Sequence, residues 1–144
     1  MNKKYELLVD DTITFLGWKL FRIKALISFG SVEAGELGGY VAKEGNLSHE
    51  GNAWVFGDAR VYGDAEVYGD ARVKSVKDYI VFKNNWSSGR YFTYTKSNKM
   101  WRAGCFYGTG QELINEAYKD SENSGKHYEA YVKFVEMLEE LENE

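Results

Sequence analysis

Small and hydrophobic residues recur with a six-residue period across the middle of the chain. The period runs four times without interruption from Gly51 to Lys74, and its second hexad reads Gly-Asp-Ala-Arg-Val-Tyr. In each hexad an alanine and a valine stand two positions apart, so both side chains can face the same side of a short strand. A period of this kind is typical of a parallel β-helix. The inward-facing set is Ala53, Val55, Ala59, Val61, Ala65, Val67, Ala71 and Val73.

The residues before the repeat predict short strands and an irregular lead-in. Residues 3–34 contain runs rich in β-branched and aromatic residues, which indicate strands that cap the start of the repeat. Residues 35–50 carry their apolar residues at uneven spacing, and eight residues separate Leu47 from Val55 where six would keep the register. We therefore expect an imperfect first turn of the repeat, or a loop that leads into it.

The chain changes character after the repeat. Thr109 and Glu112 have the spacing of a capping box, which predicts the start of a helix. A break at residues 124–125 separates this helix from a longer second one with apolar residues at helical spacing. The pattern predicts two domains: residues 1–77 with the cap strands and hexads, and residues 78–144 as a small α+β domain. Its strands are expected at residues 78–83, 90–96 and 100–106.

The hexads resemble those of left-handed β-helix proteins of the hexapeptide-repeat class, in which three hexads close one triangular coil. The resemblance implies a mainly β fold. We expect a short left-handed parallel β-helix, capped by the N-terminal strand segment and by a C-terminal β-hairpin or sheet with two helices. The regular hexads form only about one and a third coils, whereas stacked repeats usually need about three units. The flanking segments must therefore help to cover the repeat.

The C-terminal part carries a second resemblance. Residues 89–94 read Gly-Arg-Tyr-Phe-Thr-Tyr, residues 104–109 read Gly-Cys-Phe-Tyr-Gly-Thr, and two predicted helices follow. This arrangement is similar to a small domain that follows hexapeptide repeats in uncharacterised proteins of bacteriophages and prophages. No established catalytic residue can be carried over from that group. The resemblance implies a phage or prophage context, in which many small acidic proteins bind and disable host machinery.

Composition narrows the classes of function. The 144 residues include 22 Asp and Glu against 18 Lys and Arg, a balance that argues against a general nucleic-acid or membrane-surface role. The single cysteine, Cys105, has no internal disulfide partner, which fits a reducing compartment. Acidic residues interrupt the N-terminal apolar run, and no run reaches the length of a membrane span. We expect a cytoplasmic protein, in the host cell cytoplasm if the chain is phage-encoded.

Candidate catalytic groups are few. The only histidines, His49 and His127, lie outside the regular hexads, and two histidines with one cysteine do not supply a three-histidine zinc site. The corner residues Asp58, Asp64 and Asp70 point in different directions and are expected to form turns and not to bind a metal. We expect no cofactor, no metal and no catalysis. The alternative that stays open is an acyltransferase-like enzyme with an active site between subunits.

Two groups of side chains are candidates for binding. Around the C-terminal strands, arginines stand beside aromatic residues, and such sets can hold a phosphate and stack on a base. Cross-strand packing with arginine stems is the alternative. This binding set is Trp86, Arg90, Tyr94, Trp101 and Arg102. The second group is expected to be covered by neighbouring segments or by another subunit. This interface set is Phe56, Tyr62, Tyr68, Tyr131, Phe134 and Leu138.

The sequence thus predicts a non-catalytic, oligomeric binding protein, a homodimer or homotrimer. Its target would be a host protein complex or a small nucleotide. The protein would act as a phage-encoded inhibitor of a host defence complex, or as a sponge for the signalling nucleotide of that complex.

Overall fold

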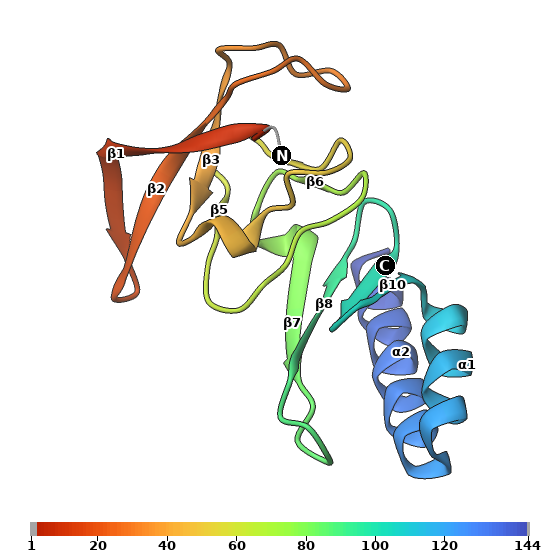
Figure 1. Ribbon diagram of the computed structural model, residues 1–144. Helices are drawn as coiled ribbons and strands as arrows, with labels where there is room; N and C mark the ends of the chain where they lie inside the picture. Colours follow the sequence, from red (N-terminus) through yellow and green to blue (C-terminus); the bar gives the residue numbers. More distant parts are fainter. Residues whose placement is uncertain (1–2, 144) are drawn as a thin grey trace.

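The N-terminal half of the molecule is built around a mixed four-stranded sheet. A computed structural model describes residues 3–143 (Figure 1), so the predicted domain limits at residues 1 and 144 lie outside the described part. The sheet has the order β1-β2-β3-β5. The first two pairings are antiparallel, and β3 pairs with β5 in parallel. The strands are β1 (Tyr5–Phe15), β2 (Trp18–Ala25), β3 (Leu37–Val41) and β5 (Arg60–Val61).

The hexads contribute very short strands and a continuous apolar interior. The strands β4 (Trp54–Val55) and β6 (Arg72–Val73) form a separate parallel pair. An isolated parallel bridge joins Leu47 to Val67. All eight alanines and valines of the predicted inward-facing set are buried, so this part of the sequence prediction is confirmed.

The predicted fold class, a short left-handed parallel β-helix with caps, is wrong. Residues 3–143 form a mixed α/β structure with two four-stranded sheets, one two-stranded sheet and two α-helices. Strand β3 pairs in parallel with β5 but antiparallel with β2, so the strand that would begin a parallel stack belongs to a mixed sheet instead. The hexads themselves supply strands of only two residues. Four hexads are too few to build a solenoid, so their apolar side chains are buried against the neighbouring sheets.

Asn46 ties the irregular lead-in to the regular hexads. Its side chain is fully buried and makes four hydrogen bonds. The backbone N–H groups of Ala42 and Lys43 each donate to Asn46 Oδ1 at 3.1 Å. Asn46 Nδ2 donates to the carbonyl oxygens of Gly63 at 3.1 Å and Ala65 at 2.8 Å. The amide therefore uses its full hydrogen-bonding capacity to join two segments of the chain.

The C-terminal half contains an antiparallel sheet and two helices. The sheet has the order β10-β9-β8-β7, which leaves β7 and β10 at its edges. Two short 3-10 helices, Glu44–Asn46 and Val76–Asp78, lie earlier in the chain. None of the helices within residues 3–143 is both long and apolar enough to cross a membrane. The C-terminal elements are β7 (Tyr79–Lys83), β8 (Tyr91–Thr95), β9 (Met100–Ala103), β10 (Phe106–Thr109), α1 (Gly110–Asp120) and α2 (Glu122–Glu142).

The capping box of α1 is confirmed, but the predicted break before α2 is misplaced. Thr109 Oγ1 accepts a hydrogen bond from the N–H of Glu112, and the Glu112 carboxylate accepts one from the Thr109 N–H. The second helix is capped by Ser121, whose Oγ accepts from the N–H of Ser124. Gly125 lies inside α2, where its missing side chain lets the Tyr118 ring of α1 pack directly against the helix.

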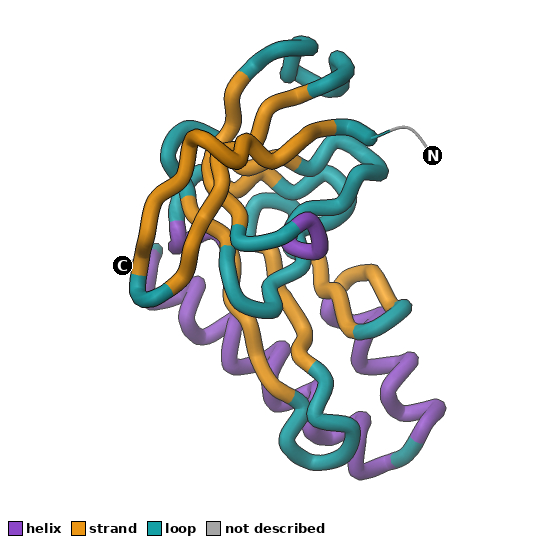
Figure 2. The backbone as a smooth tube through the Cα atoms, turned by 60° about the vertical axis from the view of Figure 1, so that its left-hand side comes forward, coloured by secondary structure: helices purple, strands orange, loops and turns teal. Residues whose placement is uncertain are grey.

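The C-terminal sheet lies between the hexads and the helices. Successive residues of a strand point to opposite faces. Thus Phe92 and Tyr94 pack with the helices, while Thr93 faces the hexads, where its Oγ1 accepts a hydrogen bond from the Glu66 N–H. Figure 1 places β1 and β2 at the opposite end of the molecule from the two helices, and Figure 2 shows the helices along its lower part. The hexads are thereby covered on one side by β1–β3 and on another by β7–β10.

Candidate functional site

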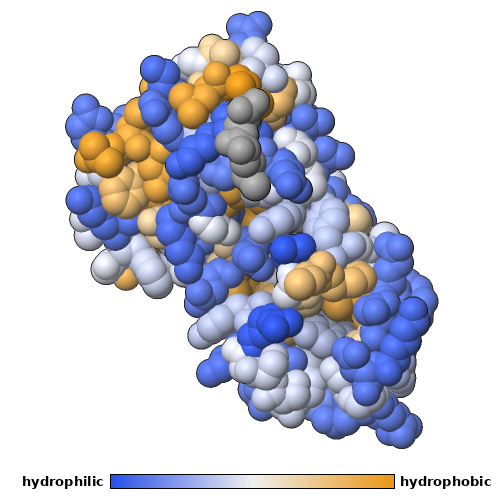
Figure 3. All heavy atoms as spheres, in the orientation of Figure 1, coloured by the Kyte–Doolittle hydropathy of each residue, from blue (hydrophilic) through white to orange (hydrophobic). Residues whose placement is uncertain are grey.

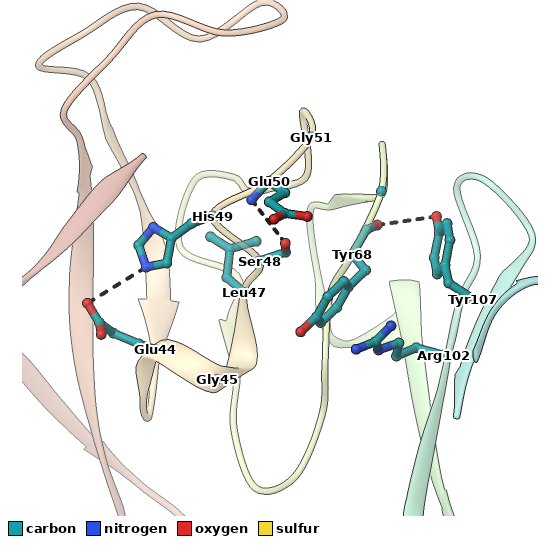
Figure 4. Close-up of a pocket in the computed structure, with 11 residues that line it drawn as sticks. Glu44, Gly45, Leu47, Ser48, His49, Glu50, Gly51, Tyr68, Arg102 and Tyr107 are labelled. Atoms are coloured by element: carbon teal, nitrogen blue, oxygen red, sulfur yellow. Dashed lines mark hydrogen bonds and ion pairs between the residues drawn. The ribbon is translucent and has the colours of Figure 1, made fainter. Parts of the chain in front are cut away.

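A cleft of about 630 Å³ opens between the hexads and the C-terminal sheet (Figure 4). We call it the junction cleft. One wall is the segment that leads into the hexads, and the other comes from β9 and β10. Its lining residues are Glu44, Gly45, residues 47–51, Tyr68, Gly69, Arg102 and Tyr107.

Arg102 is the cation of the junction cleft. It follows Trp101 on β9 and therefore points to the hexad face of the sheet, where its guanidinium carbon lies 4.1 Å from the centre of the Tyr68 ring. Its Nε is buried without a hydrogen-bond partner, and the nearest carboxylate oxygen, of Glu66, is 4.0 Å away. One terminal nitrogen reaches the carbonyl oxygen of Cys105 at 3.5 Å. The guanidinium is thus held flat on an aromatic ring while much of its hydrogen-bonding capacity is unused.

Tyr107 closes one end of the cleft. Its hydroxyl donates to the carbonyl oxygen of Tyr68 at 3.4 Å and accepts from Asn98 Nδ2 at 3.0 Å. Gly69 has φ +66°, and a Cβ on it would collide with the Tyr107 hydroxyl. Burial raises the pKa of Tyr107, so the phenol stays protonated at neutral pH. A glycine at position 69 is therefore needed for the hexads and β10 to meet.

His49 lies on the opposite wall but is not placed to act as a base. Its ring stacks on Tyr5 at 4.1 Å, and its Nδ1 accepts a hydrogen bond from the Lys4 N–H at 3.1 Å. From this bond we infer that Nε2 carries the proton of the neutral ring. Nε2 is buried without a hydrogen-bond partner, 3.8 Å from Glu44 Oε1. Burial lowers the pKa of His49, and the charges of Lys3 and Lys4 also lower it, while Glu44 raises it. The lone pair that proton abstraction requires is therefore already occupied.

The neighbouring serine is not activated either. Ser48 Oγ accepts a hydrogen bond from the Glu50 N–H at 3.0 Å. Within residues 3–143 no group of three or more His, Cys, Asp or Glu side chains lies close enough to hold a metal ion. Ser48 Oγ and His49 Nδ1 thus both accept hydrogen bonds from backbone N–H groups.

A second hollow adjoins the junction cleft and contains Arg90. This hollow has a volume of about 440 Å³ and shares Gly45 with the cleft. Arg90 is exposed, and its guanidinium packs across Gly104 in the turn between β9 and β10. Arg102 contacts Cys105 in the same turn. The structure therefore brings Arg90 and Arg102, two members of the predicted binding set, to one turn beside two adjoining hollows.

The other three members of the binding set lie on the helix face of the sheet. Tyr94 and Trp101 are 4% and 2% exposed, and the Tyr94 hydroxyl donates to Glu139 at 2.5 Å. Trp86 is half-buried and stacks on His127 of α2 at 4.6 Å. The five residues therefore do not form one surface. Strand alternation alone separates Trp101 from Arg102, because adjacent residues must face opposite sides.

The predicted interface set is divided between covered and exposed positions. Tyr62 packs against Phe15 and Trp18 of the N-terminal hairpin, and Tyr68 lies under Arg102. Phe56 is half-buried, with Arg72 over its ring at 5.1 Å. On α2, Tyr131 and Leu138 are half-buried, whereas Phe134 is 46% exposed.

Exposed hydrophobic side chains also gather at the N-terminal end. Figure 3 shows apolar atoms over the part of the surface that is built from the first strands. Val9 and Leu16 are 79% and 73% exposed, and they belong to the hairpin formed by β1 and β2. Further exposed apolar residues of this end are Trp18, Leu26, Ile27 and Leu37.

Sequence reasoning missed most of the junction cleft, although one signal pointed to it. The chain from Leu47 to Val55 is two residues longer than the hexad period allows. The structure keeps Leu47 on Val67 and Val55 on Val73, so the extra length must bulge between them. The bulging residues 48–51 form a wall of the cleft. The contribution of Tyr107 could not be found this way, because it depends on how β10 meets the hexads.

Comparison with known proteins adds no family assignment. No family model matches the chain, and no curated protein sequence is significantly similar to it. The residues of the junction cleft are therefore the basis for proposing a function.

Proposed function

We propose that the chain is a non-catalytic binding protein whose ligand carries a phosphate or carboxylate group held at Arg102. The observation that carries this proposal is the position of the Arg102 guanidinium and its small number of hydrogen bonds. It is fixed over Tyr68 at 4.1 Å, lines an open cleft, and has a buried Nε without a hydrogen-bond partner. The terminal nitrogens of Arg102 make a single contact, of 3.5 Å, with the Cys105 carbonyl oxygen, so a phosphate or carboxylate in the cleft would accept hydrogen bonds from their remaining N–H groups.

The charges around the cleft favour a ligand with one anionic end and hydrogen-bond donors at the other. Arg90 and Arg102 lie on one side of the site, at the turn that contains Gly104, and these two cations outnumber the single carboxylate of Glu66 that lies 4.0 Å from Arg102 Nε. Glu44 and Glu50 lie on the other side. A mononucleotide has this polarity, because its phosphate accepts hydrogen bonds from arginine and its base edge offers donors to carboxylates. An extended polyanion does not fit, since its far end would meet Glu44 and Glu50.

This ligand class selects between the two activities implied by the resemblance to phage proteins. We propose that the protein acts in the cytoplasm of a bacterial host and withholds a small signalling nucleotide from a defence complex. Such a role needs a binding site and no chemistry, in agreement with the hydrogen bonds that occupy His49 and Ser48.

The first experiment is native mass spectrometry of the protein purified from bacterial cells, followed by calorimetric titration. We expect a bound mass that is lost on denaturation, and binding of adenosine or guanosine monophosphate that inorganic phosphate reproduces only weakly. Arg102→Gln should weaken binding by about ten- to a hundredfold, the size expected for a hydrogen bond to a charged group.

Arg72→Gln is the matched control, because Arg72 also stacks on an aromatic ring but lies away from the cleft. Equal affinity losses in the two variants, or no binding of any titrated anion at millimolar concentration, would contradict the proposal.

A second candidate function is inhibition of a host protein complex by direct contact. The exposed apolar side chains of the N-terminal hairpin, above all Val9 and Leu16, favour it. Under this alternative, a Val9→Ser and Leu16→Ser double variant loses capture of the host complex from lysate, while Arg102→Gln retains it. Under the nucleotide proposal, Arg102→Gln loses nucleotide binding in the titration, while the Val9→Ser and Leu16→Ser double variant retains it.

A further inference from the structure

The strand β7 has an unpaired edge. It is the outermost strand of its sheet and pairs only with β8. The N–H of Lys96 donates to the carbonyl oxygen of Asp78, and the N–H of Asn84 donates to that of Arg90. In an antiparallel pair the hydrogen-bonded positions alternate, so residues 78, 80, 82 and 84 point their backbone groups toward β8. The backbone groups of Tyr79, Val81 and Lys83 therefore point away from the sheet.

These outward groups find no partner within the described chain. Among residues 3–143, no hydrogen bond involves the backbone N–H or C=O of Tyr79, Val81 or Lys83 on that side. Edge strands that stay single are usually interrupted by a bulge, a proline or inward charges. The register of β7 with β8 is regular over all five residues, and the chain contains no proline. Lys83, at the end of β7, is the only residue of this strand that would discourage pairing with another chain. We therefore expect this edge to pair with a second strand.

We propose that β7 pairs antiparallel with β7 of a second copy of this chain, about a twofold axis at Val81. This register is self-complementary. Val81 faces Val81 of the partner subunit, and Tyr79 faces Lys83 of the partner subunit, so every outward backbone group gains a partner. The two sheets become one sheet of eight strands.

The side chains of the helix face agree with this register. Ile80 comes opposite Phe82 of the partner subunit, in the position where paired side chains are closest. Both residues pack against the C-terminal core, and Phe82 touches Phe134 of α2. A five-residue edge alone buries less than the roughly 1,200 Å² that stable interfaces need. Phe134 and Met137, exposed by 46% and 62%, lie on the helix that covers this face and supply further apolar area.

The opposite face offers a charge partner. A hollow of about 480 Å³ borders Tyr79 and Val81 on the hexad side. It is lined by Trp18, Tyr62 and Tyr91, and by Asp64, whose Oδ1 lies 3.2 Å from Lys43 Nζ and whose Oδ2 is left for a second cation. Lys83 of the partner subunit stands opposite Tyr79 in the proposed register, on this same face. Its ammonium group then meets Asp64 and the aromatic rings, an environment that favours a cation.

The test is the mass of the full chain by light scattering at micromolar concentration. We expect twice the chain mass of 16.5 kDa for the parent protein. Val81→Pro removes an outward N–H group, which an edge strand tolerates, and changes the side chain that packs against the hexad core; it should yield a monomer. Val81→Ala keeps the N–H group and is the matched control, expected to remain dimeric.

A charge exchange tests the register. Lys83→Glu should weaken dimerisation by about tenfold or more, since it places a carboxylate near Asp64 of the other copy. Adding Asp64→Lys to that variant should restore the dimer, and circular dichroism reports whether each variant is folded. A monomeric parent, a folded dimeric Val81→Pro variant, or a charge exchange without restoration overturns the proposal. If Val81→Pro fails to fold, the charge exchange decides alone.

Discussion

The side-chain amide of Asn46 offers the sharpest test of how the lead-in segment is held to the hexads. Asn46 is fully buried, and its four hydrogen bonds join the N–H groups of Ala42 and Lys43 to the carbonyl oxygens of Gly63 and Ala65. Asn46→Ala removes all four bonds at once. Asn46→Asp has the same size and keeps the two bonds at Oδ1, but it replaces the donor by an oxygen.

The expected loss in the free energy of unfolding depends on how many buried backbone groups are left without a hydrogen-bond partner. Asn46→Ala leaves the Lys43 N–H and two carbonyl oxygens without a partner, each worth about 1–3 kcal/mol when buried and unsatisfied, while the Ala42 N–H keeps its hydrogen bond to the Val61 carbonyl oxygen. Water entering the space left by the amide satisfies some of these groups, so we expect a loss of about 3–5 kcal/mol. This is a large share of the about 5–15 kcal/mol by which domains are usually stable.

Asn46→Asp adds a dependence on pH. Its second oxygen would lie where Nδ2 now lies, 2.8 Å from one carbonyl oxygen and 3.1 Å from another. Burial and this repulsion raise the pKa of the folded carboxyl above its unfolded value of about 3.9. Stability is then greatest below pH 4 and is lost as the pH rises through the folded pKa. If the folded pKa is raised by two units, the free energy of unfolding of the variant is lower at pH 7 than at pH 4 by about 2 kcal/mol.

The measurement is urea unfolding of the parent and both variants at several pH values between 4.5 and 7.5, with the slope against urea as a check on two-state behaviour. The difference in the free energy of unfolding between Asn46→Asp and the parent should widen as the pH rises. The difference between Asn46→Ala and the parent should stay constant. A cost below about 1 kcal/mol for Asn46→Ala, or a pH-independent gap for Asn46→Asp, would refute the reasoning.

Two further predictions concern the core and alkaline stability. Val61→Asp places a carboxyl in the fully buried interior of the hexads and should prevent folding, so a variant that melts within about 5 °C of the parent contradicts the packing. Burial raises the pKa of Tyr79 to about 12 and also raises that of Tyr94. The stabilisation of the folded state by these protonated phenols is fully present below pH 10 and is lost as the pH rises toward 12. Burial lowers the pKa of Lys4 to about 8, so the free energy of unfolding rises as the pH rises from about 8 to 10.5. Urea midpoints measured from pH 7 to 11.5 should therefore rise and then fall, and a midpoint that falls steadily from pH 8 would exclude the Lys4 contribution.

Local pattern was enough to predict several features. The alanines and valines of the hexads are buried as their spacing required, because side-chain direction in a strand depends only on position. The Thr109–Glu112 capping box forms because both partners lie within one helical turn. The same local rule of strand alternation places Trp101 and Arg102 on opposite faces of β9, so local pattern is also sufficient to divide the predicted binding set.

The pairing of the strands and the contacts between distant side chains could not be predicted from local pattern and are seen only in the tertiary structure. The hexad pattern is compatible with stacking on other hexads, but it does not predict that β3 pairs antiparallel with β2 on its other edge. Likewise, Arg102 and Tyr68 are 34 residues apart, and the contact between them arises because β9 lies across the hexads. Which strands meet depends on the apolar surface that each arrangement buries over the whole chain. The inward-facing residues and the first helix cap could therefore be predicted from neighbouring residues alone, while the fold class and the junction cleft depend on long-range packing.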